Sequence, residues 1–228
     1  MTLLFDILFY ISLATALLGS LYGLKLAARM PFSYLVLLLW ASVIGDIIGD
    51  ISQYYYLQRN VDLGIRGVGA TYRIIEFTLL LLFFRHLEYS KIVKNAITLS
   101  GFIFIIYFIS IQPAFFRIFV DSTMVEAVSI ILVVVFSLLF FKSTMTRMEI
   151  STISKWPPFY FISAFFIYFS GASMSMLLSN SVYSIDIDMG NHLWNFNNFS
   201  LIIRNILLII GFFYTYKTKY KWSPISIH

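Results

Sequence analysis

The chain has 228 residues, of which 60% are hydrophobic and only 12% are charged, and its formal net charge is +5. A soluble domain carries about twice that charged fraction, so the composition places the chain in the membrane class. Disordered, collagen-like and small secreted scaffolds are excluded. The absence of cysteine also excludes disulfides, iron–sulfur clusters and cysteine zinc sites.

Apolar stretches long enough to cross a bilayer follow one another along the chain. A hydrocarbon core about 30 Å thick needs roughly 20 helical residues. The sequence predicts seven such spans, at about 3–24, 33–57, 68–87, 96–112, 125–141, 159–178 and 196–216. We therefore expect an all-α, polytopic membrane protein that forms a single seven-helix transmembrane domain over residues 1–228, with no room for a separate soluble domain.

The basic residues predict the orientation of this bundle. Eleven of them fall on one side of the expected membrane: Lys25, Arg29, Arg85, Lys91, Lys94, Lys142, Arg147, Lys155, Lys217, Lys219 and Lys221. The other side holds three: Arg59, Arg66 and Arg117. Lys and Arg favour cytoplasmic loops, so we expect the N-terminus outside and the C-terminus in the cytoplasm of a bacterial inner (plasma) membrane. The net charge then reflects topology and contact with lipid, and no nucleic-acid partner is expected.

Ionisable residues also occur within the spans, where a charge at a helix centre costs at least about 2.5–3.5 kcal/mol. In the expected topology they share the outer half of the bundle. They are Asp6 near the end of the first span, Asp46 and Asp50 in the second, Arg73 and Glu76 in the third, Glu126 in the fifth and Arg204 in the seventh, with Tyr72, Asn197 and Asn205 as polar neighbours. The inner halves, such as 79–84 and 206–213, are apolar. The sequence thus predicts a polar pocket that opens to the outside above a hydrophobic plug.

Two interpretations of this cluster remain open. Ion pairs such as Glu76 with Arg73 can simply hold the bundle together. However, four carboxylates face two arginines, and a surplus of two must be protonated, hydrated or matched by a cation. We therefore expect these residues to bind a small polar or cationic ligand, with a bound cation as one possibility and no metal identified.

The stretch 72–78, in which Arg73 and Glu76 are three residues apart and Phe77 follows, resembles the third helix of microbial rhodopsins and heliorhodopsins. In those proteins the acidic residue is the counterion of the retinal Schiff base. The size, the seven spans and the orientation are similar as well. The seventh span departs from the pattern because it has no lysine and places Arg204 at the approximate depth. Arginine stays protonated and does not normally form the retinal imine, so no covalent retinal and no other cofactor is expected.

A second resemblance covers the whole chain. The acidic second span with its tryptophan, Tyr72 and Glu76 in the third span, and the segment 194–198 that leads to Asn205 are similar to a group of small bacterial seven-helix membrane proteins without an assigned activity. This resemblance implies the architecture and the pocket residues. It implies no reaction.

Three functions remain open. We favour a receptor-like or sensory protein that binds its ligand in the outer pocket and contacts a cytoplasmic signalling partner through 142–158. A small-solute or proton-coupled transporter is the first alternative, although the apolar inner half offers no polar exit path. An intramembrane lipid-modifying enzyme is the second, in which Asp46 and Asp50 share a proton, but the histidines expected of a zinc hydrolase are missing. We therefore favour binding over catalysis.

Overall fold

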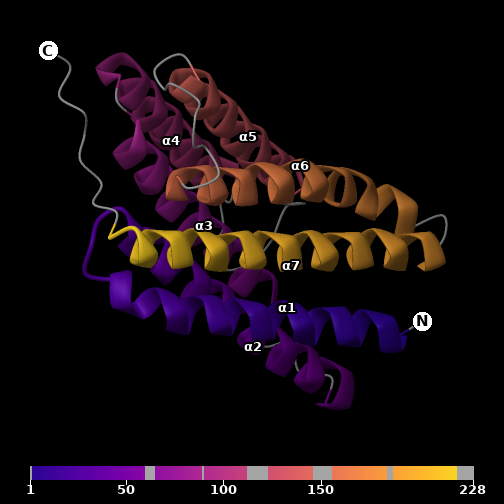
Figure 1. Ribbon diagram of the computed structural model, residues 1–228. Helices are drawn as coiled ribbons and strands as arrows, with labels where there is room; N and C mark the ends of the chain where they lie inside the picture. The colour runs from indigo at the N-terminus through magenta and orange to yellow at the C-terminus, as the bar shows by residue number, and fades with distance from the viewer. Residues whose placement is uncertain are drawn as a thin grey trace, which may run out of the picture.

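The computed structural model describes residues 2–59, 65–88, 90–111, 123–145, 156–183 and 187–219. This part of the chain forms seven α-helices and one 3-10 turn, and it contains no strand (Figure 1). The elements are α1 (Thr2–Gly23), η1 (Leu24–Leu26), α2 (Phe32–Arg59), α3 (Ile65–Leu87), α4 (Lys91–Ile111), α5 (Thr123–Met145), α6 (Pro157–Tyr183) and α7 (Ile187–Lys217).

Five segments of these helices are long and apolar enough to cross a membrane: Leu4–Leu26, Phe32–Ile51, Lys91–Ser110, Ala127–Met145 and His192–Lys217. The chain is therefore an all-helical, multi-pass membrane protein. In α3 the four charged residues Arg66, Arg73, Glu76 and Arg85 lower the apolar character of the helix. In α6 the side chains are described over only part of the length. The expectation of seven spans is thus supported directly for five helices.

Helix ends differ from the expected spans where polar residues continue a helix. α4 begins at Lys91 and not at 96 because Ser90 caps it, with the Val93 backbone N–H donating to Ser90 Oγ at 3.5 Å. α7 begins at Ile187 and not at 196. Its first turns carry an aspartate, a histidine and several asparagines, so hydropathy alone does not mark them as part of a span.

The helices form a closed ring in which each helix contacts the next and α7 returns to α1. Figure 1 shows α1 and α7 side by side and running in the same direction, with α6 antiparallel beside α7. α3 contacts α2, α4 and α5, and its side chains also reach α6 and α7. α3 therefore supplies residues to the centre of the ring.

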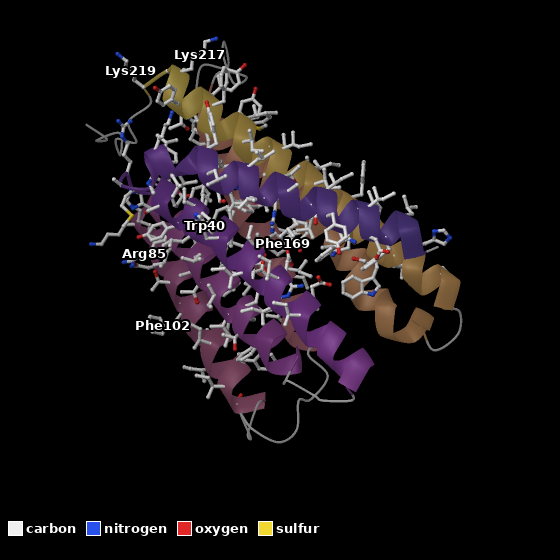
Figure 2. The ribbon with its side chains drawn as sticks, turned by 90° about the horizontal axis from the view of Figure 1, so that it is seen from below. Trp40, Arg85, Phe102, Phe169, Lys217 and Lys219 are labelled. Carbon is white, nitrogen blue, oxygen red and sulfur yellow. The ribbon has the colours of Figure 1, made fainter. Side chains whose placement is uncertain are left out.

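Described basic side chains gather at one end of the helices. Figure 2 shows Arg85, Lys217 and Lys219 toward the same end. Lys25 joins them, because its Nζ lies 5.6 Å from the centroid of the Tyr216 ring near the end of α7. The ends of α1, α3 and α7 thus face the same way, as an alternating bundle requires.

Phenylalanine fills the centre of the bundle on this basic side. The Phe161 ring of α6 lies 6.2 Å from the Phe83 ring of α3, 5.3 Å from the Phe212 ring of α7 and 5.7 Å from the Phe32 ring of α2. None of these four side chains is more than 1% exposed. The ranges 79–84 and 206–213 thus contribute Phe83 and Phe212 to a packed aromatic core. That this core closes the inner side of a pocket stays a prediction.

Candidate binding site

Arg204 lies in the middle of α7 and is only 1% exposed. Its guanidinium carbon lies 4.8 Å from the centroid of the Tyr168 ring of α6, within the range of a cation–π contact. Its Nη1 lies 3.5 Å from Oε1 of Glu76 on α3. A buried charge requires such partners, because an isolated one in a low dielectric is strongly disfavoured.

Glu76 is 2% exposed and is bound from its own helix as well. Tyr72 donates its hydroxyl hydrogen to Oε1 at 3.0 Å, and Arg73 donates from Nη1 to Oε2 at 2.8 Å. These partners lie four and three residues earlier, where one turn of helix brings side chains together. Glu76 is therefore held between an arginine of α3 and Arg204 of α7.

Asn205 fixes the guanidinium from the other side. Its Oδ1 accepts hydrogen bonds from Nε and Nη2 of Arg204 at 3.2 and 3.1 Å. Its Nδ2 donates to the Ser12 carbonyl oxygen at 3.0 Å and to Thr15 Oγ1 at 3.2 Å. Asn205 thus connects Arg204 to α1, and it leaves little freedom for the arginine to turn away from Glu76.

α2 approaches the cluster through Ser42, Gly45 and Asp46. Nη2 of Arg204 lies 3.5 Å from Ser42 Oγ. A Cβ at Gly45 would lie 3.2 Å from Cδ2 of the Tyr72 ring, so the glycine permits close approach of α2 to α3. Asp46, one turn beyond Ser42, is half-buried and interacts electrostatically with Arg204, Glu76 and Arg73.

Four buried polar atoms of α7 have no hydrogen-bond partner within the described part of the chain. They are Oδ1 of Asn195, Oδ1 of Asn197, Nδ2 of Asn198 and Nη1 of Arg204, and the last of these still has its ion-pair contact with Glu76. Asn197 and Asn198 are each 5% exposed. Leaving such a group unsatisfied costs about 1–3 kcal/mol, and unsatisfied groups in native proteins commonly mark bound water or another polar molecule. Asn197 and Arg204 are seven residues apart and so share one face of α7.

Five of the residues predicted for the site lie together: Tyr72, Arg73, Glu76, Arg204 and Asn205. The remaining four are placed differently. Asp46 joins them through electrostatic interactions, and Asn197 lies two turns before Arg204 on α7. Asp50 has an exposed side chain, and the side chain of Glu126 lies outside the described part of α5.

The described side chains show part of the expected charge balance. Among them, the cluster contains the carboxylates of Asp46 and Glu76 and the guanidiniums of Arg73 and Arg204. Of the two further carboxylates expected, Asp50 is exposed and the side chain of Glu126 lies outside the described part, so the surplus stays a prediction. No group of three His, Asp or Glu side chains suited to a metal ion lies among the described residues.

Sequence reasoning missed Tyr168, which lies beneath the Arg204 guanidinium. It also missed Ser12 and Thr15, which accept hydrogen bonds from the side chain of Asn205. Tyr168 is a tyrosine in mid-span among phenylalanines, and this position could have identified it. Ser12 and Thr15 are common residues of membrane helices, so no signal in the sequence distinguishes them.

Comparisons with protein-family models, with curated proteins and with solved structures found no match. The resemblances to rhodopsins and to small bacterial seven-helix proteins therefore stay predictions.

Proposed function

We propose that the protein is a receptor-like or sensory membrane protein that binds a small polar or cationic ligand in the outer half of its helix bundle. The observation that supports this most is the pair of polar atoms without a hydrogen-bond partner, Oδ1 of Asn197 and Nδ2 of Asn198, both buried on α7 near Arg204. A purely structural network of ion pairs is expected to satisfy its buried polar groups. Two buried asparagines with unused hydrogen-bonding atoms beside the ion pair therefore favour a binding role.

The proposal includes seven membrane spans, with the N-terminus outside the inner (plasma) membrane of a bacterium. The gathering of described basic residues at the ends of α1, α3 and α7 supports this orientation. Because the chain has no cysteine, a single added cysteine can report its own side of the membrane. We expect Ala28→Cys, at an exposed position after η1, to react with an impermeant thiol reagent only in inside-out vesicles. Labelling in intact cells would contradict the orientation.

The chemistry of the open positions constrains the ligand. Asn197 Oδ1 is an acceptor, and Asp46 adds a carboxylate that receives no hydrogen bond from the described residues. Asn198 Nδ2 is a donor. A small molecule with an amine or several hydroxyl groups satisfies the two acceptors, and an oxygen acceptor on the same molecule satisfies Asn198.

Arg204 connects such a ligand to several helices. Its side chain contacts Ser42 of α2, Glu76 of α3 and Tyr168 of α6, and Asn205 joins it to α1. In this proposal Arg204 can adopt a second arrangement with different partners among these helices. A ligand that binds one of the two arrangements better shifts the population toward it. The segment 142–158 remains the proposed cytoplasmic contact, and residues 146–155 of it lie outside the described part.

The two alternatives have less support. A transporter needs a polar path through the inner half, and the described rings of Phe32, Phe83, Phe161 and Phe212 pack closely there. A lipid-modifying enzyme with paired carboxylates needs Asp46 and Asp50 on one face. Asp46 is half-buried whereas Asp50 is exposed, so a shared proton is disfavoured.

Ligand-dependent thermal stability tests the proposal. The full chain in detergent is heated with amines, amino acids, polyols and metal cations in turn. We expect at least one class to stabilise it saturably, by about 2.7 kcal/mol when the ligand is at a hundred times its Kd. Asp46→Asn should abolish the shift, because it removes the unengaged carboxylate.

Asp6→Asn is the matched control, because Asp6 is an exposed carboxylate on α1. It should keep the full shift. The proposal is contradicted if no compound of the panel stabilises the protein, or if both variants lose the shift equally.

A further inference from the structure

A small cavity lies between the end of α1 and the end of α7, at the basic end of the molecule. It is lined by Tyr22, Lys25, Leu26 and Tyr216, and its volume is about 20 Å³. A cavity of that size holds one water-sized group, such as a single oxygen of a larger polar ligand. Lys25 is exposed, and its Nζ lies 5.6 Å from the centroid of the Tyr216 ring. The cavity therefore combines one ammonium group with two tyrosines.

Further cations follow the lining residues in the sequence, and the parts of α1, η1 and α7 near the cavity contain no carboxylate. Arg29 follows η1, and Lys217 and Lys219 end α7; all three are exposed. The sequence contains no Asp or Glu in 7–45 or in 189–228. No described carboxylate forms a salt bridge with any of these cations. The positive charge here must therefore be balanced by something outside the two helices.

The neighbouring basic end, where α3, α4 and α5 meet, is different. There Glu88 is 3% exposed, and its Oε1 accepts a hydrogen bond from the Ser90 backbone N–H at 3.0 Å. Its Oε2 lies 3.5 Å from Ser143 Oγ on α5. That end carries its own buried anion among Arg85, Lys91 and other basic residues. The α1–α7 end has no such anion, although it is equally basic.

Helix dipoles do not remove the imbalance. The C-termini of α1 and α7 each contribute roughly half a negative charge. Together they offset about one of the four cations Lys25, Arg29, Lys217 and Lys219. A strong preference for an external anion remains.

The surface next to the cavity is apolar. Leu18, Leu21 and Phe213 are 60%, 49% and 45% exposed, and they precede Lys25 of η1 and Lys217 of α7 in the sequence. Leu21 and Lys25 are four residues apart and so lie near one face. An anion that binds here therefore has a hydrocarbon surface directly below it.

We propose that this cavity binds the phosphate group of an anionic phospholipid, with Lys25 at the phosphate and the exposed leucines along the acyl chains. Basic pockets between membrane helices are suited to such headgroups, and the tyrosines lie at the depth that amphipathic rings prefer. The site does not depend on the proposed ligand of the outer half.

Native mass spectrometry of the full chain in detergent, with added phosphatidylglycerol or phosphatidylcholine, tests this inference. We expect retention of phosphatidylglycerol over phosphatidylcholine. Lys25→Gln should weaken phosphatidylglycerol binding about fivefold, because a lysine near an anionic surface contributes about that much. Lys25→Arg should retain the lipid, which also shows that the position tolerates substitution.

Lys91→Gln is the matched control, because it removes one exposed cation from the other basic end. It should leave phosphatidylglycerol binding unchanged. The inference is overturned if Lys91→Gln weakens binding as much as Lys25→Gln, because the lipid then responds to overall charge only. It is also overturned if the two lipids bind equally, or if inorganic phosphate displaces phosphatidylglycerol at equal concentration.

Discussion

The two halves of α7 are stabilised by different interactions. Toward its start, Asn197, Ser200 and Arg204 are buried polar residues, and Arg204 is fixed by charge and hydrogen bonds. Toward its end, Leu208 and Phe212 are fully buried in the hydrophobic core, and the Phe212 ring packs against Phe161 of α6. One helix therefore contributes to a charged cluster and to a phenylalanine core within a few turns.

This difference separates what positions the bundle from what can respond to a ligand. Apolar helices gain little by leaving lipid for each other, so association in a membrane depends on close packing and on interhelical hydrogen bonds. The core around Phe161 supplies packing in a fixed shape. The cluster around Arg204 contains side-chain donors and acceptors that have no hydrogen-bond partner among the described residues. The hydrogen bonds of this cluster can therefore change when a ligand binds.

The largest expected effect comes from breaking the charged cluster. Arg204→Met leaves Glu76 buried with one cation fewer, and removal of one partner from a buried ion pair costs about 3–5 kcal/mol. The double variant Glu76→Gln with Arg204→Met should recover part of that loss, because no charge is left without its partner. Reversible unfolding in mixed micelles measures both. Additive losses would contradict a direct coupling between the two side chains.

A smaller effect is expected in the aromatic core. Phe161→Ala removes a fully buried ring that touches rings from three other helices. A Phe→Ala change costs about 3–5 kcal/mol in a soluble core. We expect about 2–3 kcal/mol here, because the unfolded side chain stays in an apolar solvent.

Phe102→Ala is the control for that loss of packing. Phe102 is 62% exposed on α4 (Figure 2), and its truncation should leave the unfolding free energy almost unchanged. Equal losses for Phe161→Ala and Phe102→Ala would contradict the description of the inner half as a packed core. Ligand stabilisation should survive Phe161→Ala, in contrast to Asp46→Asn.

The smallest expected effect concerns the link between the cluster and α1. Asn205→Ala removes the hydrogen bonds to Ser12 and Thr15 and the support of Arg204. Interhelical hydrogen bonds in membranes contribute about 0.6 kcal/mol on average, with a maximum near 1.7. We expect a loss of about 1 kcal/mol in the unfolding free energy, together with a weaker ligand affinity. A variant as stable as the original chain, with unchanged affinity, would show that Asn205 does not position the arginine.

The sequence predicted the charged cluster well where helical spacing alone decides the contact. Arg73 and Glu76 are three residues apart, and their ion pair requires only that α3 be helical. Asp50 was harder to place. Each step of four residues turns the face of a helix by about 40°, so Asp50 lies about 80° from Ser42. Which of the two faces inward depends on the contact between Gly45 and Tyr72, and that contact is tertiary.

The aromatic core likewise depends on tertiary contacts that the local sequence does not predict. The apolar character of 79–84 and 206–213 is evident in the sequence. The choice of Phe161 as the ring that joins α2, α3 and α7 is not, because phenylalanine occurs at four other positions between 159 and 169 and at three positions on α5. Relative rotation and depth of the helices decide which ring becomes central, and neither leaves a local signal.

The most direct test of a polar pocket that opens to the outside is whether a thiol reagent can reach it from that side. In the cysteine-free chain, Asn197→Cys places a thiol at the unpartnered position of the outer half, and Thr215→Cys places one at a fully buried position below the aromatic core. A small impermeant thiol reagent is added outside right-side-out vesicles. We expect Asn197→Cys to be labelled, a stabilising ligand to slow this labelling, and Thr215→Cys to stay unlabelled. Equal labelling of both positions, or no labelling of Asn197→Cys, would contradict an outward-facing polar pocket.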